Sequence, residues 1–292
     1  MKSNYRYIVK AFMAMAVIAG TTSCDDFLDR EPMSSISPET YYSTAAQLEA
    51  NLNDEYPNVL PSFGQWTYGI FGEDKGTDNQ IEVNANDRYT QDRWKVPHSE
   101  SDNWKFERIY RINFFLSEAL PKFGEDMSGS QNTISGSVAT IKHYIGEMYF
   151  LRAYEYFKKL QLFGDFPIID QPLADEMEAL REASKRFPRN EVARFIISDL
   201  DKAYAYMSDV DMATTRINKD AAMLVKSRVA LFEATWLQNF KGTAFVPGGE
   251  GWPGASLHNN YQYPSGNLDN EVKYFLEPVS YTHLTLPTNS RV

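Results

Sequence analysis

One stretch of the 292-residue chain, residues 62–103, combines aromatic rings with side chains that hydrogen-bond to hydroxyl groups. Indole and phenol rings can pack on the flat apolar face of a sugar, while nearby carboxylate, amide and guanidinium groups bind its hydroxyls. The candidate ligand-binding residues are Trp66, Tyr68, Asp78, Asn79, Arg88, Tyr89 and Trp94. The alternative is that these rings only pack locally beneath long loops.

The same stretch also concentrates acidic residues, namely Glu73, Asp74, Asp78 and Glu82. Carboxylate oxygens of this kind suit calcium, but their spacing is not that of an EF-hand loop. A solvated loop is the simpler interpretation. We therefore expect no metal site and no cofactor, with calcium as the alternative.

The chain has a single cysteine, Cys24, which follows a short apolar run. Basic residues lie among positions 1–10 and the apolar residues at 11–20, a pattern typical of a secretory signal peptide and too short to span a bilayer. A cysteine at this boundary can carry acyl chains that hold the protein on a membrane. We predict a signal peptide over residues 1–23 and lipidation of Cys24; the alternative is a secreted protein with an incidental cysteine.

No arrangement of residues typical of an enzyme stands out. The chain has four histidines without a metal-ligand spacing, His98, His143, His258 and His283. The string GEGWPG (Gly249–Gly254) matches G-x-G-x-x-G, but a predicted helix rather than a strand precedes it, so a loop is the better interpretation. The 39 acidic residues leave a glycosidase pair open, because the separation it needs is spatial. We expect no catalytic residue and no enzyme activity.

Composition limits the remaining function classes. The formal net charge of −10 argues against a nucleic-acid partner, which would need a basic patch. One cysteine rules out a disulfide framework. The length allows one or two domains with a sizeable core.

Apolar residues recur at helical spacing over most of the chain outside the loop-rich stretch. The predicted helices cover residues 37–56, 101–120, 133–162, 189–207 and 218–240. Ser37 is the expected cap of the first helix, which Pro57 and Pro61 end. Gly164 and Pro167 end the helix over 133–162, and Asn218 and Asp220 begin the last one. The apolar face of the helix over 133–162 is predicted to consist of Ile134, Val138, Ile141, Ile145, Met148 and Leu151. These helices are too amphipathic to stand alone, so we predict a mainly α fold of antiparallel pairs, as in an α-solenoid.

Four residues within the predicted helices could have either a structural or a ligand-binding role. Trp104 and Trp236 fall on helices, so we expect them in the core rather than as ligand platforms. We expect Arg152 and Tyr154 to hold neighbouring helices together.

Several stretches, in this order over residues 20–240, resemble the SusD/RagB family of outer-membrane nutrient-binding lipoproteins. They are SCDDFLDREPMSSIS, YYSTAAQLEANLNDEY, WKFERIYRIN, GEMYFLRAYEYFKKLQLFGDFPII, FPRNEVARFIISDLDKAYAYM and RINKDAAMLVKSRVALF. The resemblance implies a tetratricopeptide-like α-α superhelix that carries a loop-rich ligand-binding region. It also implies a lipoprotein on the outer face of the outer membrane, with Asp25 and Asp26 as the export signal.

The function that this resemblance implies is capture of an oligosaccharide and its delivery to a TonB-dependent, SusC-like outer-membrane transporter. A glycan hydrolase on a helical scaffold is one alternative. A peptide-binding protein or a purely structural subunit of the transporter complex is another.

The resemblance also gives a domain map with one departure from the family. Family members are nearly twice as long, so residues 37–279 are expected to form an incomplete, N-terminal part of the helical domain, after a tether at 24–36. Residues 280–292, SYTHLTLPTNSRV, have no periodicity and do not resemble the family. We interpret them as a non-native tail.

Overall fold

The computed structural model describes residues 41–61, 103–124, 126–208, 212–213 and 215–285, with side-chain exposure described as far as residue 279. The helices described below belong to the unit that begins at Tyr42. Within these ranges every regular element is a helix, apart from two single β-bridges. The predicted mainly α fold is therefore confirmed.

The first described helix is α4 (Ala45–Val59). It begins with a capping box at Thr44, and residues 42–44 are not helical, so the predicted continuous helix from Ser37 is wrong. Pro57 lies inside the helix instead of ending it. The helix ends two residues later, because the residue before Pro61 takes an extended backbone, as the proline ring requires.

The next two helices, α5 (Glu107–Phe123) and α6 (Val138–Phe163), form an antiparallel hairpin. Ser137 caps α6, which therefore begins five residues after the predicted start. Gly164 ends it at a φ of 66°, a conformation that favours glycine, so the predicted C-terminus is confirmed.

The second half of the described chain contains five further helices. They are α7 (Met177–Ala183), α8 (Arg189–Tyr206), α9 (Lys219–Asn239), the short 3₁₀ helix η3 (Pro253–Ser256) and α10 (Leu268–Thr285). The Asn218 side chain accepts a hydrogen bond from the Ala221 amide at 2.9 Å and caps α9, as predicted. Helix α10 runs past the predicted boundary at Ser280.

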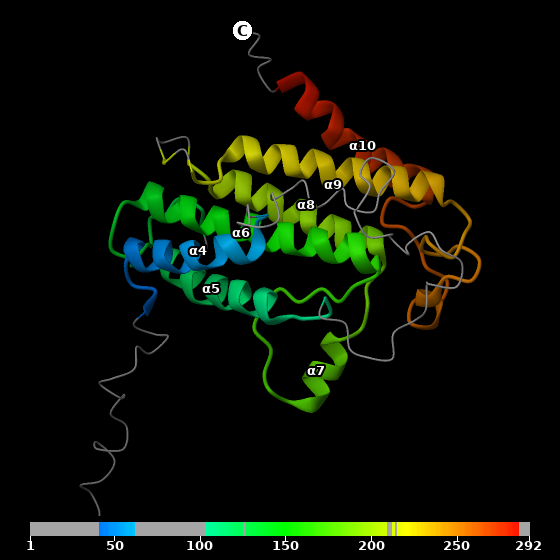
Figure 1. Cartoon of the computed structure of the whole chain (residues 1–292), viewed down its shortest axis with the longest axis horizontal. Helices are drawn as coiled ribbons and strands as arrows, with labels where there is room; N and C mark the ends of the chain where they lie inside the picture. Colours follow the sequence, from blue (N-terminus) through cyan, green and yellow to red (C-terminus); the bar gives the residue numbers. More distant parts are fainter. Residues whose placement is uncertain (1–40, 62–102, 125, 209–211, 214, 286–292) are drawn as a thin grey trace, which may run out of the picture. The chain divides into compact units, whose positions relative to one another are not determined.

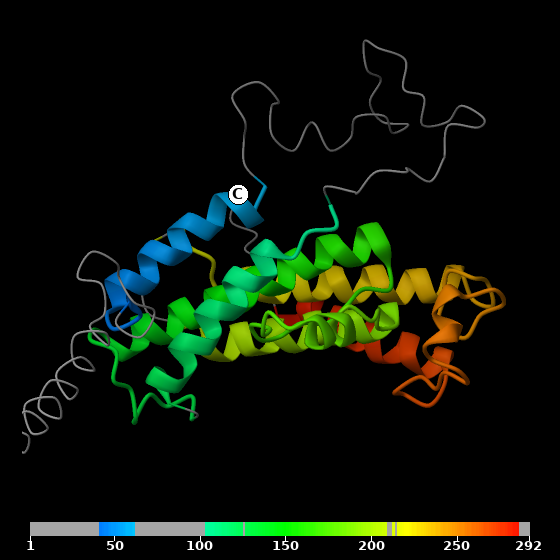
Figure 2. The ribbon, with the colours of Figure 1, turned by 90° about the horizontal axis from the view of Figure 1, so that it is seen from below.

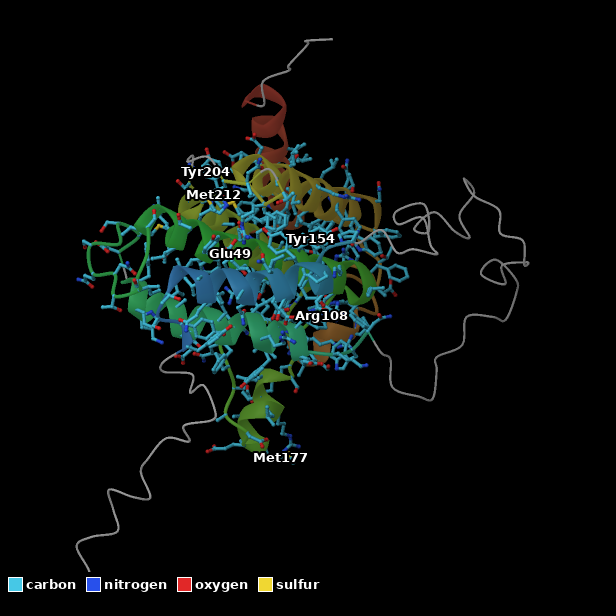
Figure 3. All side chains as sticks on the ribbon, turned by 60° about the vertical axis from the view of Figure 1, so that its left-hand side comes forward. Glu49, Arg108, Tyr154, Met177, Tyr204 and Met212 are labelled. Carbon is cyan, nitrogen blue, oxygen red and sulfur yellow. The ribbon has the colours of Figure 1, made fainter. Side chains whose placement is uncertain are left out.

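The long helices alternate in direction along the chain, and from α6 onward α6, α8, α9 and α10 stack in chain order (Figures 1 and 2). Helix α6 packs against α4, α5 and α8, while α8 packs against α9 and α9 against α10. Helix α7 projects from this stack, and Figure 3 shows Met177 on it, 82% exposed. The predicted packing of antiparallel helix pairs is confirmed.

The centre of the stack is apolar, with buried ion pairs between helices. Of the face predicted for the helix over 133–162, Ile134, Ile141, Ile145, Met148 and Leu151 are buried, whereas Val138 in the first turn of α6 is 40% exposed. Buried or half-buried arginine–carboxylate pairs join α6 to α8, α8 to α9, α8 to α10 and α6 to the segment before α9; they are Arg152–Asp199, Arg189–Glu233, Arg194–Glu271 and Arg216–Glu147. Because a buried charge without a partner is costly, each pair constrains how the two segments it joins pack together.

The Arg152 side chain confirms its predicted structural role. It donates to both Asp199 carboxylate oxygens at 2.6 and 2.8 Å, and to Asn113 Oδ1 and the Asp170 carbonyl at 2.9 Å each. It thus ties α6 to α8, α5 and the segment after α6. Tyr154 is half-exposed and stacks on Phe150 of its own helix.

Candidate functional site

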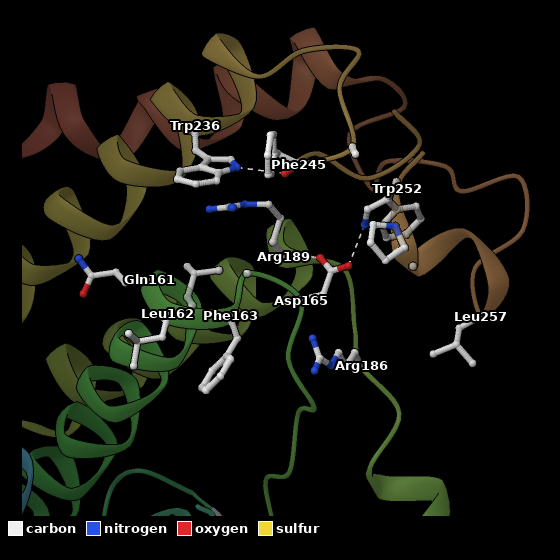
Figure 4. A pocket seen from close by; sticks show the side chains of 15 residues that line it. Gln161, Leu162, Phe163, Asp165, Arg186, Arg189, Trp236, Phe245, Trp252 and Leu257 are labelled. Carbon is white, nitrogen blue, oxygen red and sulfur yellow. Dashed lines mark hydrogen bonds between the residues drawn. The ribbon is translucent and has the colours of Figure 1, made fainter. Parts of the chain in front are cut away.

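A pocket of about 490 Å³ opens at the end of the stack where α6 and α9 finish and α8 begins (Figure 4). Its size lies within the range of small-molecule binding sites, about 300–1,000 Å³. Its walls come from the end of α6, the start of α8, the end of α9 and the segment 244–257. Residues far apart in the sequence thus share one concave surface.

The floor of the pocket, as the term is used below, is the pair of segments GDFP and FPRN, residues 164–167 and 187–190, which contribute Gly164, Asp165 and Arg189 to its lining. Phe166 and Phe187 exchange two backbone hydrogen bonds, at 3.2 and 3.1 Å, in an antiparallel bridge. Because Gly164 turns the chain directly before this bridge, the Asp165 side chain lies next to Arg189, the first residue of α8. Its Oδ1 accepts a hydrogen bond from the Arg189 amide at 2.9 Å.

The other oxygen of Asp165 holds the opposite wall. Asp165 Oδ2 accepts a hydrogen bond of 2.7 Å from the indole Nε1 of Trp252, whose side chain is only 5% exposed. Burial raises the pKa of the Asp165 carboxyl, and the hydrogen bonds from Trp252 and the Arg189 amide offset that rise only in part. Asp165 therefore couples the wall at 244–257 to the start of α8.

Trp252 lies within the GEGWPG string, and sequence reasoning did not identify its role. The structure places this string in turns that lead into η3, without the preceding strand that a dinucleotide site requires. A Cβ on Gly254 would lie 2.2 Å from Trp252 Cζ2, so the glycine lets the indole pack. The sequence signal that could have identified Trp252 was a tryptophan between glycines in a predicted turn.

A second indole, Trp236, lines the pocket beside a buried cation. The Arg189 Cζ atom lies 4.0 Å from the Trp236 ring centroid, and its guanidinium donates to both Glu233 oxygens at 2.9–3.1 Å. Trp236 Nε1 donates to the Phe245 carbonyl at 3.0 Å. Burial raises the pKa of the Glu233 carboxyl, although Arg189 opposes this rise. The ring is therefore held on several sides before any ligand arrives.

The predicted core position of Trp236 is wrong, because the ring is half-buried at the pocket. The buried face of α9 near its end contains Ala230, Ala234 and Leu237, and position 236 lies at the edge of that face. Trp104 is also only half-buried. It contacts Phe163 and Phe166 edge-on, with ring centroids 4.9 Å apart in each case.

The rim of the pocket is apolar with one exposed cation. Leu162, Phe245 and Leu257 are 58%, 61% and 54% exposed. Arg186 is exposed as well, and its Cζ lies 4.6 Å from the centroid of the Trp104 ring. An apolar rim with a few polar groups suits a ligand that presents both a flat apolar face and hydrogen-bonding groups.

The residues predicted to bind ligand lie outside the described part of the chain. This holds for the seven candidates between Trp66 and Trp94, for the acidic cluster between Glu73 and Glu82, and for the lipidation site Cys24. They stay predictions, and the structure neither joins them to the pocket nor separates them from it.

Two histidines, His143 and His258, have packing roles. His143 is buried, with its Nε2 3.0 Å from the Ile217 carbonyl and its Nδ1 3.1 Å from the Ser208 amide. His258 stacks beside Trp252, and its Nε2 lies 2.8 Å from the Arg186 carbonyl. No group of three His, Cys, Asp or Glu side chains in the described ranges is placed to hold a metal ion. None of the described helices is long and apolar enough to cross a membrane.

Comparison with known proteins finds one protein family over most of the chain. Residues 26–231 match the profile of the SusD-like family, described as starch-binding and associating with the outer membrane. SusD-like protein P2 of Formosa agariphila is 25% identical over 253 residues, which cover 82% of this chain and 46% of the relative. SusD-like protein P25 of the same organism is 25% identical over 233 residues, covering 73% and 41%. The chain spans less than half the length of these relatives.

A solved structure shares the architecture of the described helices. A SusD-like protein from Bacteroides fragilis superposes with a TM-score of 0.50 at 22% identity, covering 73% of this chain and 40% of that one. At this level the likeness concerns the fold alone. It confirms the predicted tetratricopeptide-like helical superhelix.

Proposed function

Because the chain belongs to the SusD-like family, as its sequence motifs predicted, we propose that it binds an oligosaccharide at the outer membrane. The observation that carries this proposal is the family match over residues 26–231, which includes α4 to α8 and most of α9. The pocket at the end of α6 and α9 supports it, because its size and apolar rim suit a sugar ring.

The pocket provides two kinds of contact for a sugar. The exposed ring of Phe245, with Leu162 and Leu257, offers apolar surface to the flat face of a pyranose. The guanidinium of Arg186 can donate to oxygen atoms at the edge of the same sugar. Since hydrogen bonds fix Trp236, Trp252 and Asp165 in advance, binding costs little ordering of this wall.

Capture without cleavage agrees with the state of the two carboxylates at the pocket. Asp165 accepts hydrogen bonds at both oxygens, and Glu233 is fully buried against Arg189. A glycosidase needs one carboxyl group that protonates the leaving oxygen and a second one that reaches the sugar or a water. Glu233 is buried and paired with Arg189, so within the described residues Asp165 is the one carboxylate that lines the pocket, and the absence there of a second one supports a binding protein.

The remaining parts of the proposal follow from the family and the sequence. Acyl chains on Cys24 would hold the protein on the outer face of the outer membrane. The bound oligosaccharide would pass to a TonB-dependent, SusC-like transporter, and rings between Trp66 and Trp94 would add contacts to a longer ligand. Release into a transporter requires moderate affinity.

Isothermal titration of the full chain with neutral oligosaccharides, including malto- and laminari-oligosaccharides, tests the binding proposal. For a ligand that binds, Phe245→Ala should weaken affinity about five- to tenfold, since one aromatic contact contributes about 1–1.5 kcal/mol. Leu224→Ala is the matched control, because Leu224 is 53% exposed on α9 and does not line the pocket. Unchanged affinity in Phe245→Ala would remove the pocket from the proposal, and release of shortened products would replace binding by hydrolysis.

A further inference from the structure

We propose that this pocket selects acidic oligosaccharides, with Arg186 binding the carboxylate of a uronic acid. The inference rests on the proposed function and names its substrate class. It depends on four charges at the pocket: Asp165, Arg186 and Arg189 line it, and Glu233 is the buried partner of Arg189.

Three of these four charges are already engaged. The Arg189 guanidinium is buried and bonded to Glu233 through three contacts of 2.9–3.1 Å, so the two charges neutralise each other. Both oxygens of Asp165 accept hydrogen bonds, one from the Trp252 indole and one from the amide that opens α8. Each Asp165 oxygen thus already accepts one hydrogen bond from the protein, and the Arg189 N–H groups that face Glu233 are used in the ion pair.

The fourth charge, Arg186, is exposed and available. Within the described residues its guanidinium has neither an ion pair nor a hydrogen bond, and its close partner is the ring of Trp104, 4.6 Å from Cζ. A cation over a ring face keeps its N–H groups free, because the attraction uses the ring quadrupole. Figure 4 shows Arg186 beside the pocket, below Asp165.

Backbone contacts at Arg186 and at the residue after it hold the position from which the Arg186 side chain extends. The Arg186 carbonyl lies 2.8 Å from His258 Nε2, and the next residue, Phe187, forms the bridge with Phe166. The bridge thus holds the backbone next to Arg186, and the Trp104 ring contacts its guanidinium. A held guanidinium presents a planar fork of N–H groups, which matches the two oxygens of a carboxylate better than a single hydroxyl.

The rest of the pocket suits a sugar that carries such a group. Leu162 and Phe245 offer apolar contact for the ring face, while the carboxylate of a uronic acid projects from the ring edge. The negative net charge of −10 repels anions at long range, so the preference must come from a direct contact. Removing that one contact should therefore remove the preference.

Matched ligands test this directly in the full chain. Trisaccharides of galacturonic, glucuronic and mannuronic acid are each titrated beside their methyl esters, which keep the shape and lose the charge. For at least one pair the acid should bind about tenfold more tightly than its ester, which corresponds to about 1.4 kcal/mol. Arg186→Gln should bring the acid to the affinity of the ester, and Arg186→Lys should restore only part of the difference.

A charge-matched control separates local from general electrostatics. Arg181→Gln makes the same change on α7, outside the pocket, and should leave the preference intact. Equal affinities for acid and ester in all three pairs, or an equal loss in both glutamine variants, would overturn the assignment of Arg186. Binding of neutral glycans in that case would leave the proposed function standing, whereas no binding of any glycan, neutral or acidic, would remove both.

Discussion

Replacing Trp252 by phenylalanine tests whether one hydrogen bond holds the wall of the pocket in place. The indole Nε1 donates to Asp165 Oδ2 at 2.7 Å, and the two residues are 87 positions apart. Phenylalanine keeps much of the apolar packing of the ring but has no donor. Asp165 Oδ2 then loses its partner in a partly desolvated position.

The size of the effect follows from the nature of the acceptor. A hydrogen bond to a charged group contributes about 1.5–3 kcal/mol net. Asp165 is only half-buried, so water can replace part of what is lost, and we expect about 1–2 kcal/mol. Since 1.4 kcal/mol is a tenfold change, the fraction of molecules with the wall detached should rise about five- to thirtyfold.

Amide hydrogen exchange measured by mass spectrometry reports this change locally. Peptides covering residues 244–257 should exchange faster in Trp252→Phe by the same factor, while peptides from the centre of α6 should not change. Trp104→Phe is the control, because it makes the same ring change at an indole that has no hydrogen bond within the described residues.

Equal exchange in Trp252→Phe and the wild type would refute this reasoning. It would mean that other contacts hold the wall, such as the hydrogen bonds from Tyr263 to the Pro247 carbonyl at 2.6 Å and from Trp236 to the Phe245 carbonyl. Faster exchange throughout the helices would indicate loss of global stability instead.

Two further substitutions test the charges behind the pocket. Glu233→Gln leaves Arg189 buried without a countercharge, so unfolding should cost about 3–5 kcal/mol less, seen by calorimetry as a clearly lower Tm. Glu182→Gln, in an exposed pair with Lys185, should change stability by less than about 1 kcal/mol, and equal effects would contradict the argument. Asp165→Asn removes a carboxyl group whose pKa is raised in the folded state. Because the folded wild type holds this proton more tightly than the unfolded chain does, its stability falls as pH rises above about 4. The stability difference between wild type and variant should therefore shrink towards neutral pH, and a growing difference in denaturant titrations would show a lowered pKa.

The sequence predicted those features of the fold that depend on short-range signals. Asn218 caps α9 and Gly164 ends α6, because a side-chain acceptor and a positive φ are properties of single positions. The buried face of α6 followed from its helical period. The start of α4 was missed although Thr44 and Gln47 form a capping box that the sequence contains, because the apolar period continues across it; the bridge from Thr44 to Ser135 is the long-range contact that no local pattern records.

The pocket was missed for a related reason. Its main connection joins Asp165 to Trp252 through packing of α6, α8 and α9, and neither residue has a distinctive local signature. Trp236 was assigned to the core because helical periodicity gives the direction of a side chain only to within roughly one position. In the last turn of α9, a shift of one position separates residues that face the core from residues that line the pocket.

The two parts of the pocket have different relations to the family. The floor, built from the GDFP and FPRN segments, lies within residues 26–231, the part that matches the SusD-like profile. Trp236, Phe245, Trp252 and Leu257 lie beyond that match. The resemblance therefore explains the frame that places Asp165 and Arg186, but it says nothing about the wall that would face a ligand. The proposed ligand contacts come from both parts, Arg186 within the match and Phe245 beyond it, so binding must be measured with variants of each.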